Sequence, residues 1–184
     1  SRISSIQCLQ RISGKAHDFS RGSMSSSRMQ AKSQRPRIIQ QRRNSAMIRH
    51  DTYIKDYDWD VTLFYNAKPR DTSYIMRELW KCGIPAENYY EASHTLSNGK
   101  PNQGLTYNNS RDHRSIIVIG HVSDVWELID TVEHEGRHLI QGICNAYGIN
   151  PNSERAAYME GRAFKQIFKE IAYGFGGMLA DKYL

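Results

Sequence analysis

The sequence predicts one α+β domain, in which a small and mostly antiparallel sheet packs beside two helices. Three short segments, at 58–66, 104–107 and 115–119, are rich in β-branched and aromatic residues, which is typical of strands. The segments between and after them repeat their apolar residues with helical spacing. At 184 residues and 39% hydrophobic residues, the chain is long enough for one modest core.

The sequence of the first half of the domain predicts a strand, a helix and a loop. Order is expected from about Tyr53, with the strand 58–66 following closely. A helix is predicted over 73–82, because its apolar residues recur at helical spacing and Gly83 stands where a helix ends. Residues 84–101 lack a clear period and end in a strong turn signal, so we expect a loop there.

The second half predicts a hairpin followed by two helices. The polar stretch 108–114 joins the last two strands and favours an antiparallel hairpin. Ser123-Asp124 is a good N-cap pair for a helix that Gly148 ends. Another helix is expected over about 153–173, because the glycines from Gly174 onward are expected to end it. The apolar residues early in the first of these helices are expected in the core: Trp126, Leu128, Ile129 and Val132.

The helix that follows Asp124 carries an H-E-x-x-H motif, His134-Glu135-Gly136-Arg137-His138. Side chains four residues apart lie on one face of a helix, so both imidazoles can bind one metal ion. Glu135 then lies close enough to accept a proton from water held at that metal. Because the motif arises by chance in about one chain in a hundred of this composition, the neighbouring elements have to support it.

A catalytic zinc needs a third protein ligand besides His134 and His138, and the next helix offers two glutamates. Glu160 lies near the middle of the apolar face, where a carboxylate is costly to bury unless it is paired or binds metal. Glu154 lies in the first turn, where it could simply favour the helix dipole. The two point to different faces, so only one of them is expected to bind the metal.

This order of elements resembles the gluzincin metallopeptidases, whose zinc ligands are two histidines and a glutamate. It is closer still to the small zincin-like peptidases of phages and mobile elements, including the ImmA/IrrE type. Their third ligand opens a pattern of glutamate followed by alanine and a large apolar or aromatic residue. The segment from Glu154 to Gly161 is similar to that pattern, which favours Glu154 as the ligand. The resemblance covers about residues 52–173, and the short spacing of 15 residues between His138 and Glu154 keeps Glu160 as the alternative.

The resemblance implies a zincin-like domain over 50–184 that hydrolyses a peptide bond in a protein or peptide substrate with Zn²⁺. Glu135 would be the general base. The developing oxyanion needs a further donor, and Tyr158, Tyr147 and His121 are candidates that the sequence does not rank. One strand of the hairpin is expected to form an exposed edge to which an extended peptide adds, as in zincins generally.

Residues 1–49 form a basic tail, with eleven Lys and Arg and one acidic residue, about +10 in charge against about −4 for 50–184. Few large apolar residues occur in it, so we expect disorder or loose helix. An Arg-rich arm can hold nucleic acid through phosphates. The alternative function is therefore a nucleic-acid-associated, antirestriction-like module whose zinc site is structural or inactive. A solvated tail is the simpler interpretation.

The cysteines and the hydropathy pattern predict a cytoplasmic protein. Cys8, Cys82 and Cys144 are odd in number and widely spaced, which favours free thiols in a reducing compartment. No apolar run reaches 18 residues, so no transmembrane helix is expected. The N-terminus also lacks the apolar region of a secretory signal.

Overall fold

The computed structural model describes residues 46–100 and 103–183. Its centre is a four-stranded mixed sheet with the strand order β1-β2-β4-β3. β1 pairs antiparallel with β2, β2 pairs parallel with β4, and β4 pairs antiparallel with β3. The predicted α+β class is confirmed, and antiparallel pairs outnumber the parallel one. The strands are β1 (Ile48–Ile54), β2 (Trp59–Ala67), β3 (Gly104–Asn109) and β4 (Arg114–Gly120).

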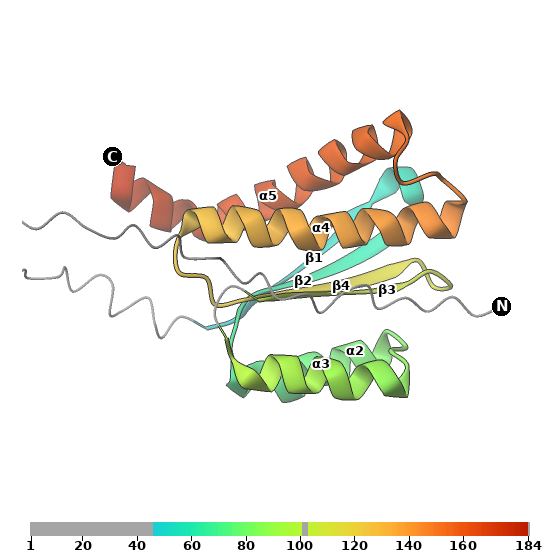
Figure 1. Cartoon of the computed structure of the whole chain (residues 1–184). Coiled ribbons are helices and arrows are strands. Elements are labelled where there is room, and N and C mark those ends of the chain that lie inside the picture. Colours follow the sequence, from blue (N-terminus) through green and yellow to red (C-terminus); the bar gives the residue numbers. More distant parts are fainter. Residues whose placement is uncertain (1–45, 101–102, 184) are drawn as a thin grey trace, which may run out of the picture. The chain divides into compact units, whose positions relative to one another are not determined.

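Helices cover both faces of this sheet (Figure 1). α2 (Thr72–Lys81) and α3 (Ala86–Asn98) lie on one face, and α4 (Val125–Tyr147) and α5 (Glu154–Tyr183) lie on the other. Short 3-10 turns, Lys55–Tyr57 and Pro69–Asp71, follow β1 and β2. The sheet is therefore the middle layer of three.

Two separate cores result from the alternation of side chains along the central strands. Leu63 and Ile117 are buried with the residues of α4 and α5. Their neighbours Phe64 and Val118 are buried with the residues of α2 and α3. Since β2 and β4 are apolar on both faces, they anchor both layers of helices.

The predicted hairpin and the ends of α4 are confirmed. β3 and β4 form an antiparallel pair, with Thr106 opposite Ile117. The Asp124 side chain caps α4 by accepting hydrogen bonds from the main-chain N–H groups of Trp126, at 2.9 Å, and Glu127, at 3.1 Å. Gly148 ends the helix with a φ of +62°, a conformation that glycine adopts without strain.

Two elements differ from the sequence prediction in the first half of the domain. β1 begins at Ile48, inside the expected tail, and its pairing with β2 supplies an edge strand. The expected loop 84–101 contains α3 instead. Ala92 is the one residue of α3 that is fully buried, and the partly buried Tyr89 and Leu96 pack against the same core. These three residues recur at helical spacing within a mostly polar segment, so the apolar signal of this helix is weak.

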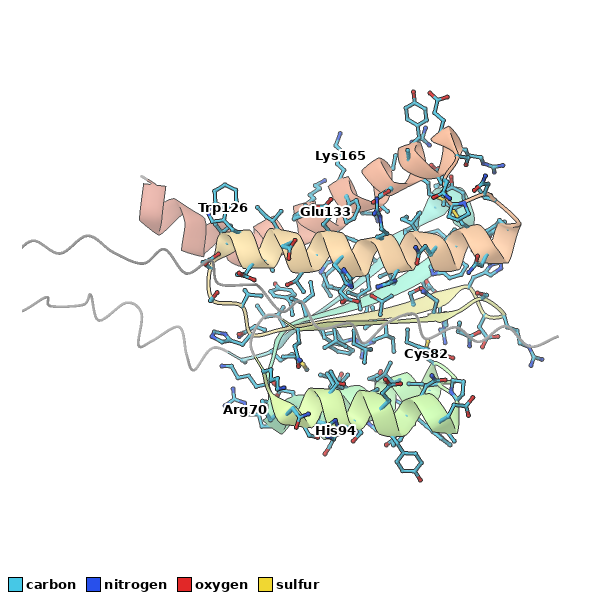
Figure 2. All side chains as sticks on the ribbon, viewed as in Figure 1. Arg70, Cys82, His94, Trp126, Glu133 and Lys165 are labelled. Atoms are coloured by element: carbon cyan, nitrogen blue, oxygen red, sulfur yellow. The ribbon has the colours of Figure 1, made fainter. Side chains whose placement is uncertain are left out.

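Two predictions about the last two helices were also wrong. α5 continues to Tyr183, so the glycines from Gly174 onward do not end it. Trp126 and Ile129 are 75% and 37% exposed rather than in the core, whereas Leu128 and Val132 are buried as expected. Figure 2 shows Trp126 projecting from α4 away from the sheet. Apolar spacing identified the helix correctly. The start of α4 nevertheless extends past the core, so Trp126 and Ile129 remain exposed.

Several expectations fall partly or wholly outside the described residues. The basic tail lies there except for residues 46–49, and so does Cys8. Cys82 and Cys144 are free and buried, and burial raises the pKa of Cys82 to about 11. In the part of the chain that the structure describes, no helix is long and apolar enough to span a membrane.

Candidate metal centre

The two histidines of the motif meet on one side of α4, next to β3. Nε2 of His134 and Nε2 of His138 lie 3.2 Å apart, and the two ring centroids are 4.8 Å apart. Both side chains are half-buried. The spacing of four residues on a helix produces this pairing, as the sequence predicted.

The distance between these nitrogens fits a shared zinc ion. Imidazole nitrogens bind zinc at about 2.0–2.1 Å with tetrahedral angles, which separates two such ligands by about 3.3 Å. The 3.2 Å between the Nε2 atoms is close to that separation. His134 and His138 therefore form a two-nitrogen donor set of the right type and spacing for zinc.

Gln141, one turn after His138, sets the orientation of that imidazole. Nδ1 of His138 lies 3.3 Å from Oε1 of Gln141, an acceptor, so the proton of a neutral ring belongs on Nδ1. The Nε2 lone pair is then directed toward His134. Partial burial lowers the pKa of His138, opposed by the bond to Gln141, so the ring favours the neutral form that a metal ligand requires.

Glu135 points from α4 onto β3 and is 3% exposed. Its carboxyl group lies over Gly104, where a Cβ would overlap it. Oγ1 of Thr106 lies 2.7 Å from Oε2 of Glu135 and 3.0 Å from its main-chain oxygen. A glycine and a hydroxyl of the strand thus make the space and the polar contact that the buried carboxyl group needs.

Burial raises the pKa of Glu135 to about 7, against the opposing effect of the hydrogen bond from Thr106. The Thr106 hydroxyl has one proton for the two oxygens of Glu135 that surround it. When Glu135 is ionised, the hydroxyl can donate to the carboxylate. When Glu135 is protonated, the acid can donate to Oγ1 and leave the hydroxyl proton for the main-chain oxygen. Both protonation states are accommodated near neutral pH.

A chain of three hydrogen bonds, of which the last is partly buried and the other two are buried, connects the sheet to the main chain of α4 at the motif. Nε1 of Trp59 donates to Oγ of Ser115 at 2.8 Å, and that hydroxyl donates to Oδ1 of Asn108 at 2.6 Å. Nδ2 of Asn108 donates to the main-chain oxygen of His138 at 3.0 Å. The Asn108 amide occupies the place that a Cβ at Gly142 would take.

The two candidate third ligands lie on α5, which packs along a different side of α4. Oε1 of Glu160 is 3.7 Å from Nε of Arg137, whereas Glu154 is exposed and accepts a hydrogen bond of 3.2 Å from Tyr158. Among residues 46–100 and 103–183, no group of three or more His, Cys, Asp or Glu side chains could hold a metal ion. The choice between Glu154 and Glu160 stays a prediction.

The three candidate oxyanion donors have their contacts away from the histidine pair. Tyr147 donates to the main-chain oxygen of Tyr57 and lies nine residues beyond His138, about 13 Å along the helix axis. Tyr158 is bonded to Glu154 and is 64% exposed. His121 is exposed, and its Nδ1 lies 3.4 Å from Oδ1 of Asn66.

A groove of about 410 Å³ lies on the other side of the sheet, and neither motif histidine lines it. Its charged groups are largely paired with one another. Arg49 is bonded to Asp51 and Glu78, each at 3.0 Å, and Arg114 lies 3.7 Å from Asp60. Paired charges leave little for a ligand, so this groove is a weaker candidate site than the histidine pair.

Sequence reasoning missed the residues of β3 that support the motif. Gly104, Thr106 and Asn108 alternate with the apolar residues Leu105 and Tyr107, so the strand pattern itself places the first three on one face. Small and polar residues at every position of one face are a signal for a special contact. The pattern did not identify α4 as the partner.

Comparison with known proteins gives no family for this chain. No protein-family model matches it, and no curated protein or solved structure is significantly similar to it. The functional assignment therefore depends on the motif and the geometry around it.

Proposed function

We propose that this chain is a zinc-dependent hydrolase of peptide bonds with a zincin-like fold, encoded by a phage or other mobile element. The observation that carries the proposal is the 3.2 Å separation of the His134 and His138 Nε2 atoms, beside a buried glutamate whose pKa is about 7. Two nitrogen ligands and a base of matched pKa are among the groups that metal-assisted hydrolysis requires.

In this proposal, His134 and His138 hold the metal ion and Gln141 orients the second ring. When bound, zinc supplies a Lewis acid that polarises a carbonyl group and acidifies water. Position and resemblance favour different third ligands. The contact with Arg137 supports Glu160, because it lies beside the motif, and Glu154 lies about 9 Å farther along α5. The sequence pattern that opens at Glu154 supports the other choice.

Glu135 is the proposed general base. A base works best when its pKa is near the working pH, and burial against β3 raises the pKa of this carboxyl group to about 7. Thr106 keeps the carboxyl group hydrogen-bonded in both protonation states. The group can therefore take up a proton and return it without losing its place.

The proposed substrate is a protein or peptide in extended form. β3 has no neighbour on its outer side among the described strands, and its inner face packs on α4 next to the histidines. An extended peptide that added to this edge by main-chain hydrogen bonds would run beside the metal centre. Tyr158, Tyr147 and His121 are the oxyanion donors that the sequence offers, and each makes its contacts in this structure away from the histidine pair.

Metal content and hydrolysis test the proposal together. We expect about one zinc per purified parent chain, lost in His138→Ala and in only one of Glu154→Ala and Glu160→Ala. Glu135→Gln should keep the zinc and lower the cleavage of fluorescently labelled casein by about 10²–10⁴-fold. Glu133→Gln, at an exposed position of the same helix, is the matched control. Full activity of Glu135→Gln, or a parent that takes up no zinc, would refute the proposal.

The alternative of a nucleic-acid-associated module is supported by the charge of residues 1–49, about +10. Removing residues 1–46 should abolish DNA binding if the alternative is right, and should leave zinc content and hydrolysis intact if the peptidase proposal is right. Titration of labelled duplex DNA at several salt concentrations gives the readout, since phosphate contacts weaken steeply with salt.

A further inference from the structure

The contact between the end of β3 and α4 is polar and partly buried. Asn108 is 9% exposed and donates a hydrogen bond of 3.0 Å to the main-chain oxygen of His138. We infer that Asn108 is a positioning residue of the metal centre, fixing the main chain of α4 at His138 and thereby the spacing of the two imidazole nitrogens. The inference rests on the proposed metal site and holds whether or not that site is hydrolytic.

The direction of each hydrogen bond in the chain from Trp59 follows from chemistry. An indole N–H can only donate, so Oγ of Ser115 must accept from Trp59. The hydroxyl proton of Ser115 is then available for Oδ1 of Asn108, 2.6 Å away. With its oxygen engaged there, the amide group of Asn108 directs its N–H toward His138. Two residues of the sheet thus hold this amide in one orientation.

Gly142 allows the Asn108 amide to reach the helix. In an α-helix the oxygen of residue 138 accepts from the N–H of residue 142, so Asn108 is a second donor to that oxygen. A Cβ at position 142 would overlap the amide group of Asn108. Glycine is unfavourable inside a helix, and here its lack of a side chain makes room for the contact beside the ligand.

His138 is consequently held at both ends. Asn108 fixes its main chain, and Gln141 accepts from its Nδ1 at 3.3 Å. Hydrogen bonds that orient a metal ligand typically change metal affinity by about 10–100-fold when they are removed. The main-chain contact should change metal affinity similarly, because it fixes the position of the main-chain atoms from which the His138 side chain extends.

The next residue, Asn109, supplies a matched control. Its Nδ2 also donates to a main-chain oxygen, that of Cys82 at 2.8 Å, between β3 and the end of α2. Both asparagines therefore connect β3 to a helix, but on opposite sides of the sheet. Asn108 contacts the main chain of α4, and Asn109 contacts the residue that follows α2. Replacing either removes a hydrogen bond from an amide to a main-chain oxygen. Asn109→Ala also removes the hydrogen bonds of its amide with Asp112 and with the main-chain N–H of Arg111 in the turn after β3, so it is the harsher change. Only the contact of Asn108 involves α4.

Zn²⁺ affinity of the metal-stripped full chain, measured by competition with a chromophoric chelator, tests the inference. Asn108→Ala should weaken Zn²⁺ binding by about 10–100-fold, and Asn109→Ala should leave it unchanged. Zn²⁺ should also shift the indole N–H resonance of Trp59 in NMR spectra of the parent, and this shift should disappear in Asn108→Ala. If Asn108→Ala does not fold, Ser115→Ala leaves the amide present but unsupported and should weaken binding less.

The Gly142→Ala substitution tests whether Gly142 acts through Asn108. In the parent it should weaken Zn²⁺ binding, because the new methyl group displaces the Asn108 amide. Added to Asn108→Ala, it should cause no further loss, since the space is then empty. A purely destabilising role of either residue would give losses in both backgrounds.

The outcomes separate this inference from the proposed function. Parental affinity in Asn108→Ala, or an equal loss in Asn109→Ala, would overturn the positioning role. Zinc binding without casein cleavage by the parent would refute the peptidase proposal and leave the positioning role intact. A parent that binds no zinc would overturn both, because no metal centre would then exist to be positioned.

Discussion

The two sides of α4 that contact the sheet and α5 are built from different chemistry. Its apolar side, which includes Leu139 and Ile143, is fully buried in the core shared with β2, β4 and α5. Its polar side meets β3 through Glu135, Gly142 and the main chain of His138. Hydrophobic burial is strong but non-directional, whereas hydrogen bonds require defined distances and angles. The apolar side thus supplies stability, and the polar side supplies position.

Leu139→Ala should break the apolar side and have the largest effect on stability. Leu139 is 0% exposed, and removing a buried leucine side chain costs about 2–5 kcal/mol. Urea denaturation of the metal-free protein measures the loss. The fraction that remains folded should bind Zn²⁺ nearly as the parent does, because the contacts of β3 with the motif are intact. A loss well below 2 kcal/mol would contradict the proposed division between the two sides.

Glu135→Gln should stabilise the metal-free protein at alkaline pH. The carboxyl group has an ordinary pKa of 4.5 and a folded pKa of about 7. Folding therefore favours its protonated form, and this contribution is fully present below about pH 4.5 and lost as the pH rises through 7. At pH 8 the variant should exceed the parent by on the order of 2–3 kcal/mol, with the difference vanishing near pH 4.

Urea denaturation across this pH range provides the measurement for Glu135→Gln. Glu133→Gln, which also removes one negative charge but at an exposed site, controls for the change in net charge. A difference between parent and Glu135→Gln that did not grow with pH would mean that Glu135 is not buried in the folded protein. The catalytic role would then lose its basis in a raised pKa.

Thr106→Val should change the titration of Glu135 more than it changes stability. The Thr106 hydroxyl lowers the pKa of Glu135, so its removal should raise that pKa. The titration midpoint of Glu135 should therefore lie at a higher pH in the variant than in the parent. The loss in stability should be about 1 kcal/mol. NMR chemical shifts of the Glu135 carboxyl carbon against pH report the change. A midpoint at or below that of the parent would contradict the contact.

Trp126→Ala should have the smallest effect. Because Trp126 is 75% exposed, its removal should change the free energy of unfolding by no more than about 0.5 kcal/mol. A core tryptophan would cost about 3–5 kcal/mol instead. Thermal unfolding of parent and variant distinguishes the two values and tests whether the start of α4 extends past the core.

The apolar side of α4 could be predicted from the sequence, and the polar side could not. Periodicity and caps located α4 from Asp124 to Gly148, because both signals are local. The same periodicity misplaced Trp126 in the core, since it gives the direction of a side chain and not what covers it. The motif likewise predicted the pairing of His134 and His138, which depends on helix geometry alone.

Contacts between elements that are distant in the sequence could not be predicted. The roles of Thr106 and Asn108 depend on which helix lies over β3, and nothing local to the strand specifies that. α3 was missed because its core contacts, Tyr89, Ala92 and Leu96, are spread along a mostly polar segment and only Ala92 is fully buried. The third ligand is open for the same reason, since sequence spacing does not fix how α5 lies along α4.

The chain of hydrogen bonds that ends at His138 also has a consequence for how the protein folds. All of its members except Trp59 come from the consecutive segment formed by β3, β4 and α4. Hairpin and helix contacts form quickly because they close short loops, whereas the parallel pairing of β2 with β4 joins Asp60 to Arg114 across a long stretch of chain. We therefore expect the contacts of β3, β4 and α4 around the two histidines to form before the contact with Trp59, which joins residues that are farther apart in the sequence.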